Sequence, residues 1–215
     1  MDSFSDLGVR FDSKLCFSDH INDKINKAYS VLGVIKRNFI YMDKTTFILL
    51  YKALVRPHLE YANAVWCPYK KGDIKLVEKV QKRATKLIIS LKHLTYTERL
   101  KQLQLPTLKY RRLRGDMIEV FNMVHKYAAV KLNFNVFSTT RGNKYKLQKN
   151  TSHYNLRKFF FSSRIVNIWN SLPDTVVDAD TINTFKRRLD KHWLNQDVVY
   201  NFYAELLTGT GGALN

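Results

Sequence analysis

The sequence predicts a mainly α-helical protein with a short N-terminal β-hairpin and a smaller C-terminal helical region. Apolar residues recur at helical spacing along most of the 215 residues, whereas strict alternation of apolar and polar residues is confined to the start. Hydrophobic residues make up 45% and aromatic residues 13% of the chain. This composition is enough for a buried core and excludes a chain that is disordered as a whole. The length fits one large domain or two small ones.

The first predicted element is a hairpin over residues 4–17. Its turn is expected at residues 12–14, where the sequence reads Asp-Ser-Lys. The alternating apolar positions on either side are Leu7, Val9, Phe11, Leu15 and Phe17. Because an isolated hairpin is marginally stable, we expect this one to pack against another element.

Two helical segments are predicted next. A helix from about Asp19 has one apolar face, made of Ile21, Ile25, Ala28, Leu32 and Ile35. Residues 43–66 predict a second segment with a kink or restart at Pro57, because proline lacks an N–H and clashes with the preceding turn. Its apolar stripe is Phe47, Leu50, Tyr51, Leu54 and Val55.

Residues 74–91 predict the clearest amphipathic helix, with its cations mostly off the apolar stripe. The stripe is Val77, Val80, Ala84, Leu87 and Leu91, and the cations are Lys75, Lys79, Lys82, Arg83 and Lys86. Thr95 and Glu98 have capping-box spacing and open a short helix that ends near Pro106. Thr107 can cap a further helix, whose apolar positions are Leu108, Leu113, Met117, Val120, Phe121 and Val124.

The C-terminal third begins with residues 130–153, which have weak periodicity and are expected to form a basic loop between two regions. Helices are then predicted over 164–171 and 181–193 within a C-terminal helical region at 154–200. The apolar face of the last helix is Ile182, Phe185, Leu189 and Trp193. Residues 201–215 are expected to form a tail, of which LTGTGGALN (207–215) is expected to be disordered.

The net charge of +18 is concentrated in two windows of the sequence. Residues 70–114 hold 14 lysines and arginines against 3 acids, and residues 141–164 hold 7 lysines and arginines and no acid. The rest of the chain is therefore neutral overall. A charge of this size, gathered in this way, predicts a surface that binds a polyanion, either nucleic acid or an anionic membrane face.

No motif in the chain marks an active site. The six histidines lack a His or Cys partner at metal-ligand spacing, and no Gly-rich loop precedes a Lys-Ser/Thr pair. Asp178 and Asp180 come closest to a carboxylate pair, but they precede a predicted helix start and are expected to interact with its dipole. We therefore predict no metal site and no cofactor. Ser-His-Asp catalysis stays open on composition alone, although no nucleophile elbow is present.

Cellular location is predicted from the cysteines and the N-terminus. Cys16 and Cys67 form no CxxC pair and are typical of reduced thiols in an intracellular protein. No basic segment followed by an apolar stretch occurs at the start, and no apolar run approaches the ~20 residues that span a bilayer. We expect a nuclear or cytoplasmic protein without a membrane partner.

Aromatic residues lie among the cations of both windows, a pattern typical of nucleic-acid binding. Cations contact phosphates, and exposed aromatic rings stack on unpaired bases. The candidate aromatic residues are Tyr96, Tyr110, Tyr145, Tyr154 and Phe159–Phe161, of which Phe160 and Phe161 are expected in the core. The candidate phosphate contacts are Lys79, Lys82, Arg83, Lys86, Lys92, Arg99, Arg111, Arg112, Arg114, Arg157, Lys158 and Arg164.

Several long and distinctive strings occur in order over most of the chain. They are Asp6-Leu7-Gly8-Val9, LYKALVRPHLEYANAVWCP (50–68), VEKVQKRATKLI (77–88), YTERLKQLQLPTLKYRRLRGDM (96–117), RKFFFSSRIVNIWNSLP (157–173) and TFKRRLD (184–190). Together they resemble, in collinear order, the C-terminal third of reverse transcriptases from non-LTR (LINE-type) retrotransposons, especially the jockey-like branch.

The resemblance implies a role for each region. Residues 1–18 resemble the last hairpin of the polymerase palm, and residues 19–129 resemble the helical thumb that grips the template–primer duplex. Polymerases of this family are RNA-directed DNA polymerases that use magnesium at palm aspartates. Those aspartates, the fingers and the endonuclease are expected N-terminal to Met1. The resemblance thus implies descent from a transposable element, as a fragment, a decayed copy or a repurposed piece, and no catalysis by this chain alone.

Three functions remain open at the level of sequence. The leading hypothesis is a thumb-like module that binds RNA, DNA or their template–primer duplex without catalysis. The second is the C-terminal part of an active split or longer reverse transcriptase, partnered by the missing palm and fingers. The third is a protein-interaction or anionic-membrane-surface module, supported by the amphipathic helix at 74–91.

Overall fold

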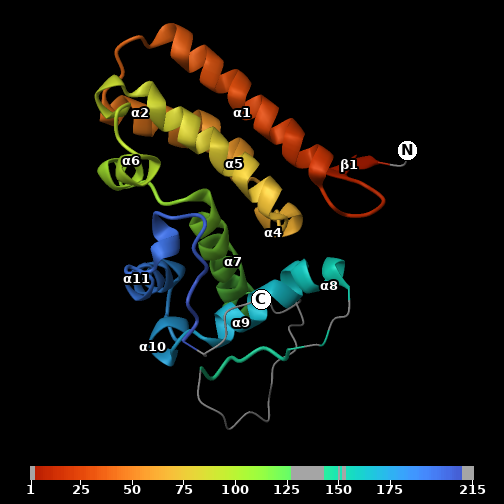
Figure 1. Cartoon of the computed structure of the whole chain (residues 1–215). Coiled ribbons are helices and arrows are strands. Elements are labelled where there is room, and N and C mark those ends of the chain that lie inside the picture. Colours follow the sequence, from red (N-terminus) through yellow and green to blue (C-terminus); the bar gives the residue numbers. More distant parts are fainter. Residues whose placement is uncertain (1–2, 127–142, 150, 152–153, 210–215) are drawn as a thin grey trace. The chain divides into compact units, whose positions relative to one another are not determined.

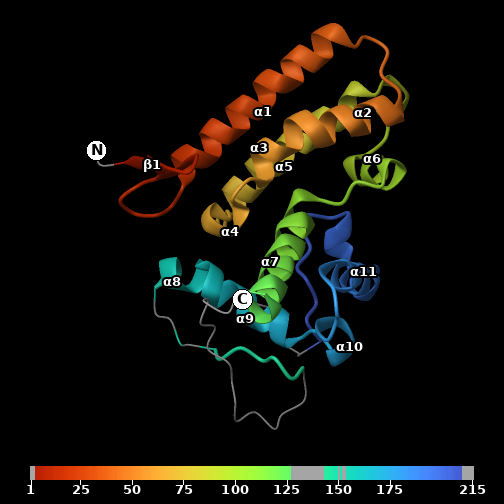
Figure 2. The ribbon, with the colours of Figure 1, turned by 180° about the vertical axis from the view of Figure 1, so that it is seen from behind.

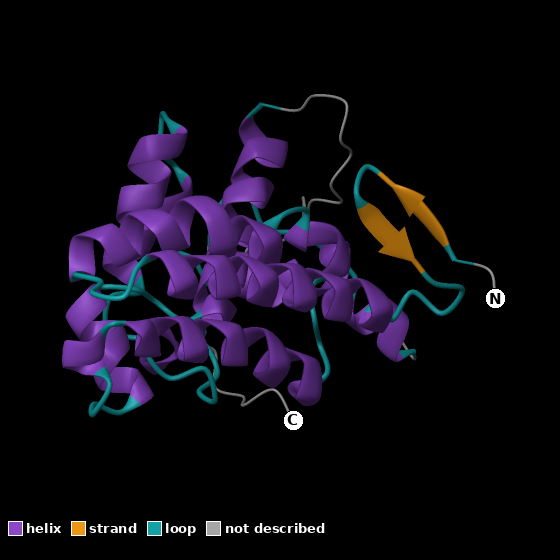
Figure 3. Cartoon of the chain, turned by 90° about the horizontal axis from the view of Figure 1, so that it is seen from above, coloured by secondary structure: helices purple, strands orange, loops and turns teal. Residues whose placement is uncertain are grey.

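The predicted mainly α-helical fold is confirmed in a computed structural model that describes residues 3–126, 143–149, 151 and 154–209 (Figures 1 and 3). The chain forms two compact units. The N-terminal unit is Met1–Arg112 with Tyr200–Phe202, and the C-terminal unit is Leu113–Val199 with Tyr203–Asn215. The boundary between the units falls between Arg112 and Leu113, inside helix α7 (Leu108–His125). The sequence predicts it at residues 130–153.

The N-terminal hairpin is present, but its predicted turn is wrong. Strands β1 (Phe4–Asp6) and β2 (Val9–Phe11) pair antiparallel across a two-residue turn at Leu7 and Gly8, whose φ angles of 44° and 78° are both positive. The carboxylate of Asp12 instead accepts the backbone N–H groups of Lys14, Cys16 and Phe17. The Asp-Ser-Lys segment therefore closes a loop that leads into the first helix.

Helix α1 (Ser18–Asn38) packs with the face that the sequence predicts, since all five expected apolar residues are buried. Of the kink or restart expected at Pro57, the structure shows a restart. Helix α2 (Lys44–Leu50) runs into a π-helical turn (Tyr51–Val55), which is followed by α3 (Arg56–Glu60) and α4 (Asn63–Trp66). The wider π turn ends two residues before the proline, which stands in the first turn of α3. The helix thus changes its winding just where the proline ring would clash with a regular preceding turn.

Helix α5 (Lys71–Ala84) continues through two 3₁₀ turns, Thr85–Leu87 and Ile89–Leu91. The capping box predicted for Thr95 and Glu98 is present and opens α6 (Tyr96–Leu103). The side chain of Thr107 accepts the N–H of Tyr110 and caps α7, as expected. In this unit α1 packs against α5 and α3, and the views from front and back both show α1 and α5 side by side (Figures 1 and 2).

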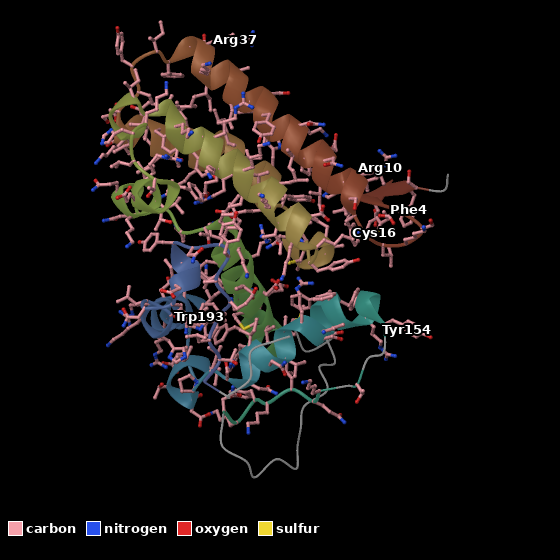
Figure 4. The ribbon with its side chains drawn as sticks, viewed as in Figure 1. Phe4, Arg10, Cys16, Arg37, Tyr154 and Trp193 are labelled. Atoms are coloured by element: carbon pink, nitrogen blue, oxygen red, sulfur yellow. The ribbon has the colours of Figure 1, made fainter. Side chains whose placement is uncertain are left out.

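The C-terminal unit contains α8 (Asn155–Phe159), α9 (Phe161–Asn170), α10 (Asp174–Val177), α11 (Ile182–His192) and a 3₁₀ turn (Asp197–Val199). Its core includes Trp169, Phe185 and Trp193, and the ring of Phe121 from α7 stacks on Phe185 at 4.4 Å between centroids. Figure 4 labels Trp193 among these helices.

Two segments outside the helices also differ from expectation. Of the loop predicted at 130–153, residues 143–149 belong to the C-terminal unit, since the Asn143 side chain donates to the carbonyl oxygens of Trp169 and Leu172. Residues 130–142, 150, 152 and 153 lie outside the described residues. Of the expected disordered tail, Leu207 is held in place, since its backbone N–H and C=O both bond the Gln196 side chain. Residues 210–215 lie outside the described residues.

Candidate nucleic-acid interface

One face of α5 and its 3₁₀ extension has a row of exposed lysines, here called the basic stripe: Lys71, Lys75, Lys79, Lys82 and Lys86. At 100° per residue these positions fall within an arc of about 80°, and at 1.5 Å per residue they extend over about 22 Å. None of the five forms an ion pair with a carboxylate in the part of the chain that the structure describes. Their charges are therefore available to a ligand.

The opposite face of α5 fixes the direction in which the basic stripe points. Val77, Val80 and Ala84 are in the core of the N-terminal unit. Beside them, buried Glu78 and Gln81 form a hydrogen-bond network that would be lost if the helix turned about its axis. An unpaired buried polar group costs about 1–3 kcal/mol, so this network fixes the orientation of α5 about its own axis.

Glu78 and Gln81 together bond several distant elements. The Glu78 carboxylate accepts the Tyr96 hydroxyl at 2.5 Å and the backbone N–H of Leu108 at 3.0 Å, so it also caps the start of α7. Gln81 accepts the Tyr51 hydroxyl at 2.6 Å and donates to the Pro106 carbonyl oxygen at 3.0 Å. These bonds tie α5 to the π turn, to α6 and to α7.

Burial sets the ionisation of this network. It raises the pKa of Glu78, while the hydrogen bond from Tyr96 and the charge of Arg112 act in the opposite direction. Burial, followed by the Glu78 charge, raises the pKa of Tyr51 and of Tyr96. Both hydroxyls therefore remain protonated donors over the physiological range, as a structural network requires.

Arg83 is exposed beside the basic stripe, as the sequence predicts. Its guanidinium carbon lies 5.4 Å from the ring centroid of Tyr29 on α1, a cation–π geometry. The contact joins the C-terminal end of α5 to α1. Lys92 is likewise exposed, in the loop before α6.

Arg99 was expected on the binding surface, and its burial contradicts that expectation. Its Nε donates to the Thr85 hydroxyl at 3.0 Å and its Nη1 to the Leu94 carbonyl oxygen at 2.5 Å. Thr85 begins the 3₁₀ extension of α5, where the regular helical bonds end. The guanidinium thus provides donors inside the protein at the point where α5 changes its winding.

Arg112 is also buried, and its two terminal nitrogens have no hydrogen-bond partner among the residues that the structure describes. Arg111 forms a two-bond ion pair with Glu60. Arg111 and Arg112 therefore do not extend an exposed phosphate-binding surface as expected. Arg111 is paired with Glu60, and Arg112 is buried.

Arginines of the C-terminal unit are paired in the same manner. Arg114 bonds both carboxylate oxygens of Asp190 at 2.5 and 2.7 Å, and Arg164 bonds both oxygens of Asp116 at 2.9 Å. Asp116 is buried. Of the cations predicted for the second patch, Arg157 and Lys158 are exposed, and Lys158 lies 5.7 Å from the ring centroid of Phe159.

The candidate aromatic residues also separate into two groups. Tyr110 is buried and Tyr96 bonds Glu78, so neither ring is free to stack on a base. Tyr154 is exposed, and so is Phe160, which the sequence placed in the core. Lys71 and Lys75 were missed as candidate contacts, although their spacing of four residues continues the row of Lys79 backward along the helix.

Metal and membrane features can be stated for residues 3–126, 143–149, 151 and 154–209. No cluster of three or more His, Cys, Asp or Glu side chains there could hold a metal ion. No described helix combines the length and apolar character needed to cross a bilayer. Asp178 pairs with Lys144 at 2.8 Å, and the hydrogen bond from Lys144 holds the pKa of Asp178 below its usual value. The start of α11 is capped by Thr181 instead.

Comparisons with known proteins add one partial match. No family model matches the chain. An uncharacterized protein of Caenorhabditis elegans is 29% identical over 112 residues, which are 51% of this chain and 57% of that protein. The matched region thus spans little more than half the length of this relative. No solved structure matches the chain.

Proposed function

We propose that this chain is a nucleic-acid-binding module that grips a template–primer duplex, as the thumb-like C-terminal part of a LINE-type reverse transcriptase. The observation that carries the proposal is the basic stripe, with five exposed lysines in a row and no carboxylate partner among the described residues. The buried network of Glu78 and Gln81 supports it, because it keeps this row directed at solvent.

The spacing of the basic stripe suits a phosphate backbone. Neighbouring lysines of the row are three or four residues apart, which is about 5–6 Å along the helix, so several of them can contact successive phosphates of one strand. Lysine ammonium groups contact phosphates without reading bases, so the proposed binding has affinity and little sequence preference. In the resemblance to reverse transcriptases, aspartates and magnesium belong to the palm, and the proposed role here is to hold the duplex.

A salt titration tests the proposal. Binding of the full chain to an RNA–DNA hybrid would be followed by fluorescence anisotropy, for the wild type and for the triple variant Lys75→Gln, Lys79→Gln, Lys82→Gln. We expect the variant to bind about 10- to 100-fold more weakly and to lower the slope of log affinity against log salt by about 2–3, since each phosphate contact contributes about 0.9.

The matched control removes the same charge elsewhere in the N-terminal unit. The triple variant Lys14→Gln, Lys52→Gln, Lys101→Gln changes three exposed lysines that lie outside the basic stripe. It is expected to retain most of the affinity. A flat salt response of the wild type, or equal losses in the two triple variants, would refute the proposed interface.

A further inference from the structure

The connection between α1 and α2 exposes three consecutive large apolar side chains. Phe39, Ile40 and Tyr41, here called the aromatic loop, are 41%, 71% and 89% exposed. Single apolar residues are common on protein surfaces, but a contiguous exposed group at a loop tip is typical of a binding surface.

The aromatic loop is anchored at both ends. The Phe39 N–H donates to the Ile35 carbonyl oxygen at 3.0 Å, and Met42 is buried in the core. Asp43 then caps α2 by accepting the N–H of Thr46 at 2.9 Å. The three side chains therefore lie on a short loop that is anchored at both ends. This anchoring reduces the conformational entropy that the loop loses when a ligand binds.

The surroundings of the aromatic loop are cationic. Lys36 and Arg37 are exposed in the last turn of α1, and Figure 4 labels Arg37 at that end of the helix. Lys44 follows at the start of α2. The single acid within residues 36–44 is Asp43, whose carboxylate is occupied by the cap and by the Thr46 hydroxyl. An aromatic tip with a cationic rim complements a nucleobase flanked by phosphates.

The aromatic loop lies near the end of the basic stripe within the same compact unit. Arg83 sits against Tyr29 of α1, and ten residues of α1 separate Tyr29 from Phe39. This corresponds to about 15 Å along the helix axis. Figures 1 and 2 both show the connection and the C-terminal end of α5 at the same end of the unit. A strand that leaves the basic stripe at this end can reach the aromatic loop within about four or five nucleotides, at roughly 3.4 Å each.

We infer that the aromatic loop stacks on an unpaired base of a strand whose backbone lies along the basic stripe. The preferred ligand is then a duplex that continues into a single-stranded overhang, rather than a blunt duplex. This inference rests on the proposed function, and it adds a base-binding site about 15 Å along α1 from the cation–π contact that Arg83, beside the stripe, makes with Tyr29.

The test compares two ligands of the full chain, a blunt RNA–DNA hybrid and the same hybrid with a short overhang of either polarity containing 2-aminopurine. The double variant Phe39→Ser, Tyr41→Ser removes both rings, Tyr41→Phe keeps the second ring, and Leu49→Ser is the matched control at another exposed apolar position of the unit. Affinity and 2-aminopurine fluorescence are measured, and circular dichroism verifies that each variant is folded.

We expect the double variant to lose about 10-fold in affinity for the overhang hybrid and to release the fluorescence quenching caused by stacking, with blunt-hybrid affinity unchanged within about twofold. Tyr41→Phe and Leu49→Ser should bind both ligands like the wild type. Equal losses on both ligands, or no loss on either, would overturn the inference.

Three further outcomes separate this inference from the proposed function. A wild type that binds blunt hybrid in a salt-dependent manner, yet gains nothing from the overhang, overturns only the stacking site. A wild type that binds neither hybrid overturns both proposals. Phosphatidylserine vesicles form the last arm. If the double variant loses vesicle binding while its binding to the overhang hybrid is intact, the loop contacts membranes and the inference is wrong.

Discussion

The basic helix of the N-terminal unit and the arginines of the C-terminal unit use positive charge in opposite ways. The lysines of the basic stripe are exposed and have no carboxylate partner among the described residues. Arg114 and Arg164, by contrast, each bond both oxygens of an aspartate. The number of cations in a sequence is therefore a poor measure of the charge available to a ligand. Arginines that bond both oxygens of an aspartate are already neutralised within the protein.

The largest expected effect is the loss of the Arg164–Asp116 pair. Replacing Arg164 by alanine removes the two hydrogen bonds that the buried Asp116 carboxylate accepts from its guanidinium. The free energy of unfolding, measured by urea denaturation, should fall by about 3–5 kcal/mol. Arg157→Ala, at an exposed position of the same unit, is the control and should stay within about 0.5 kcal/mol. If both variants lost a similar amount of stability, the proposed difference between ion-paired and exposed cations would be wrong.

Acid is expected to act on the N-terminal unit through His20. Burial, followed by the charge of Lys24, lowers the pKa of His20 from 6.5 to about 4, and its Nδ1 accepts the N–H of Arg10. Protonation therefore favours the unfolded chain. The contribution of His20 is complete above pH 6.5 and is lost as the pH falls from 6.5 to about 4, by at most about 3 kcal/mol.

Urea denaturation between pH 7 and pH 4.5 measures this loss, with His20→Asn as the matched variant, since its side-chain oxygen can still accept the Arg10 N–H. The variant should be less stable than the wild type at pH 7 and should show a smaller decline with acid. An identical pH dependence of the two proteins would exclude His20 as the group responsible.

The smallest expected effect on stability is at the basic stripe. Lys79→Gln removes an exposed charge without a carboxylate partner, so the free energy of unfolding should change by no more than about 0.5 kcal/mol. Its affinity for an RNA–DNA hybrid should nevertheless fall. Arg114→Gln should show the reverse, a loss of stability with affinity retained. A stability loss at Lys79 as large as that at Arg114 would remove the distinction between the two units.

Local signals in the sequence predicted much of the fold. The apolar face of α1, the Thr95 capping box and the break at Pro57 each depend on neighbours within a few residues, and all three are present. The hairpin turn was misplaced because Asp-Ser-Lys is a familiar turn sequence, whereas the actual turn holds Leu7 with positive φ beside Gly8.

The candidate site was predicted less completely. The exposure of Lys79, Lys82 and Lys86 follows from helical spacing. The pairing of Arg111 with Glu60 and of Arg114 with Asp190 joins residues 51 and 76 positions apart, which no local pattern encodes. The same holds for Arg99, whose burial depends on where the backbone of α5 changes to a 3₁₀ turn.

The return of Tyr200–Phe202 to the N-terminal unit has a consequence for how the protein folds during synthesis. Thr97 donates to the Tyr200 carbonyl oxygen across 103 residues, and the ring of Phe202 packs against Tyr96. The N-terminal unit therefore remains incomplete until Tyr200–Phe202 have been translated, after the whole segment Leu113–Val199. Contacts of such long sequence separation slow folding and prolong the exposure of apolar surface. The N-terminal unit thus benefits from protection against aggregation while the chain is still growing.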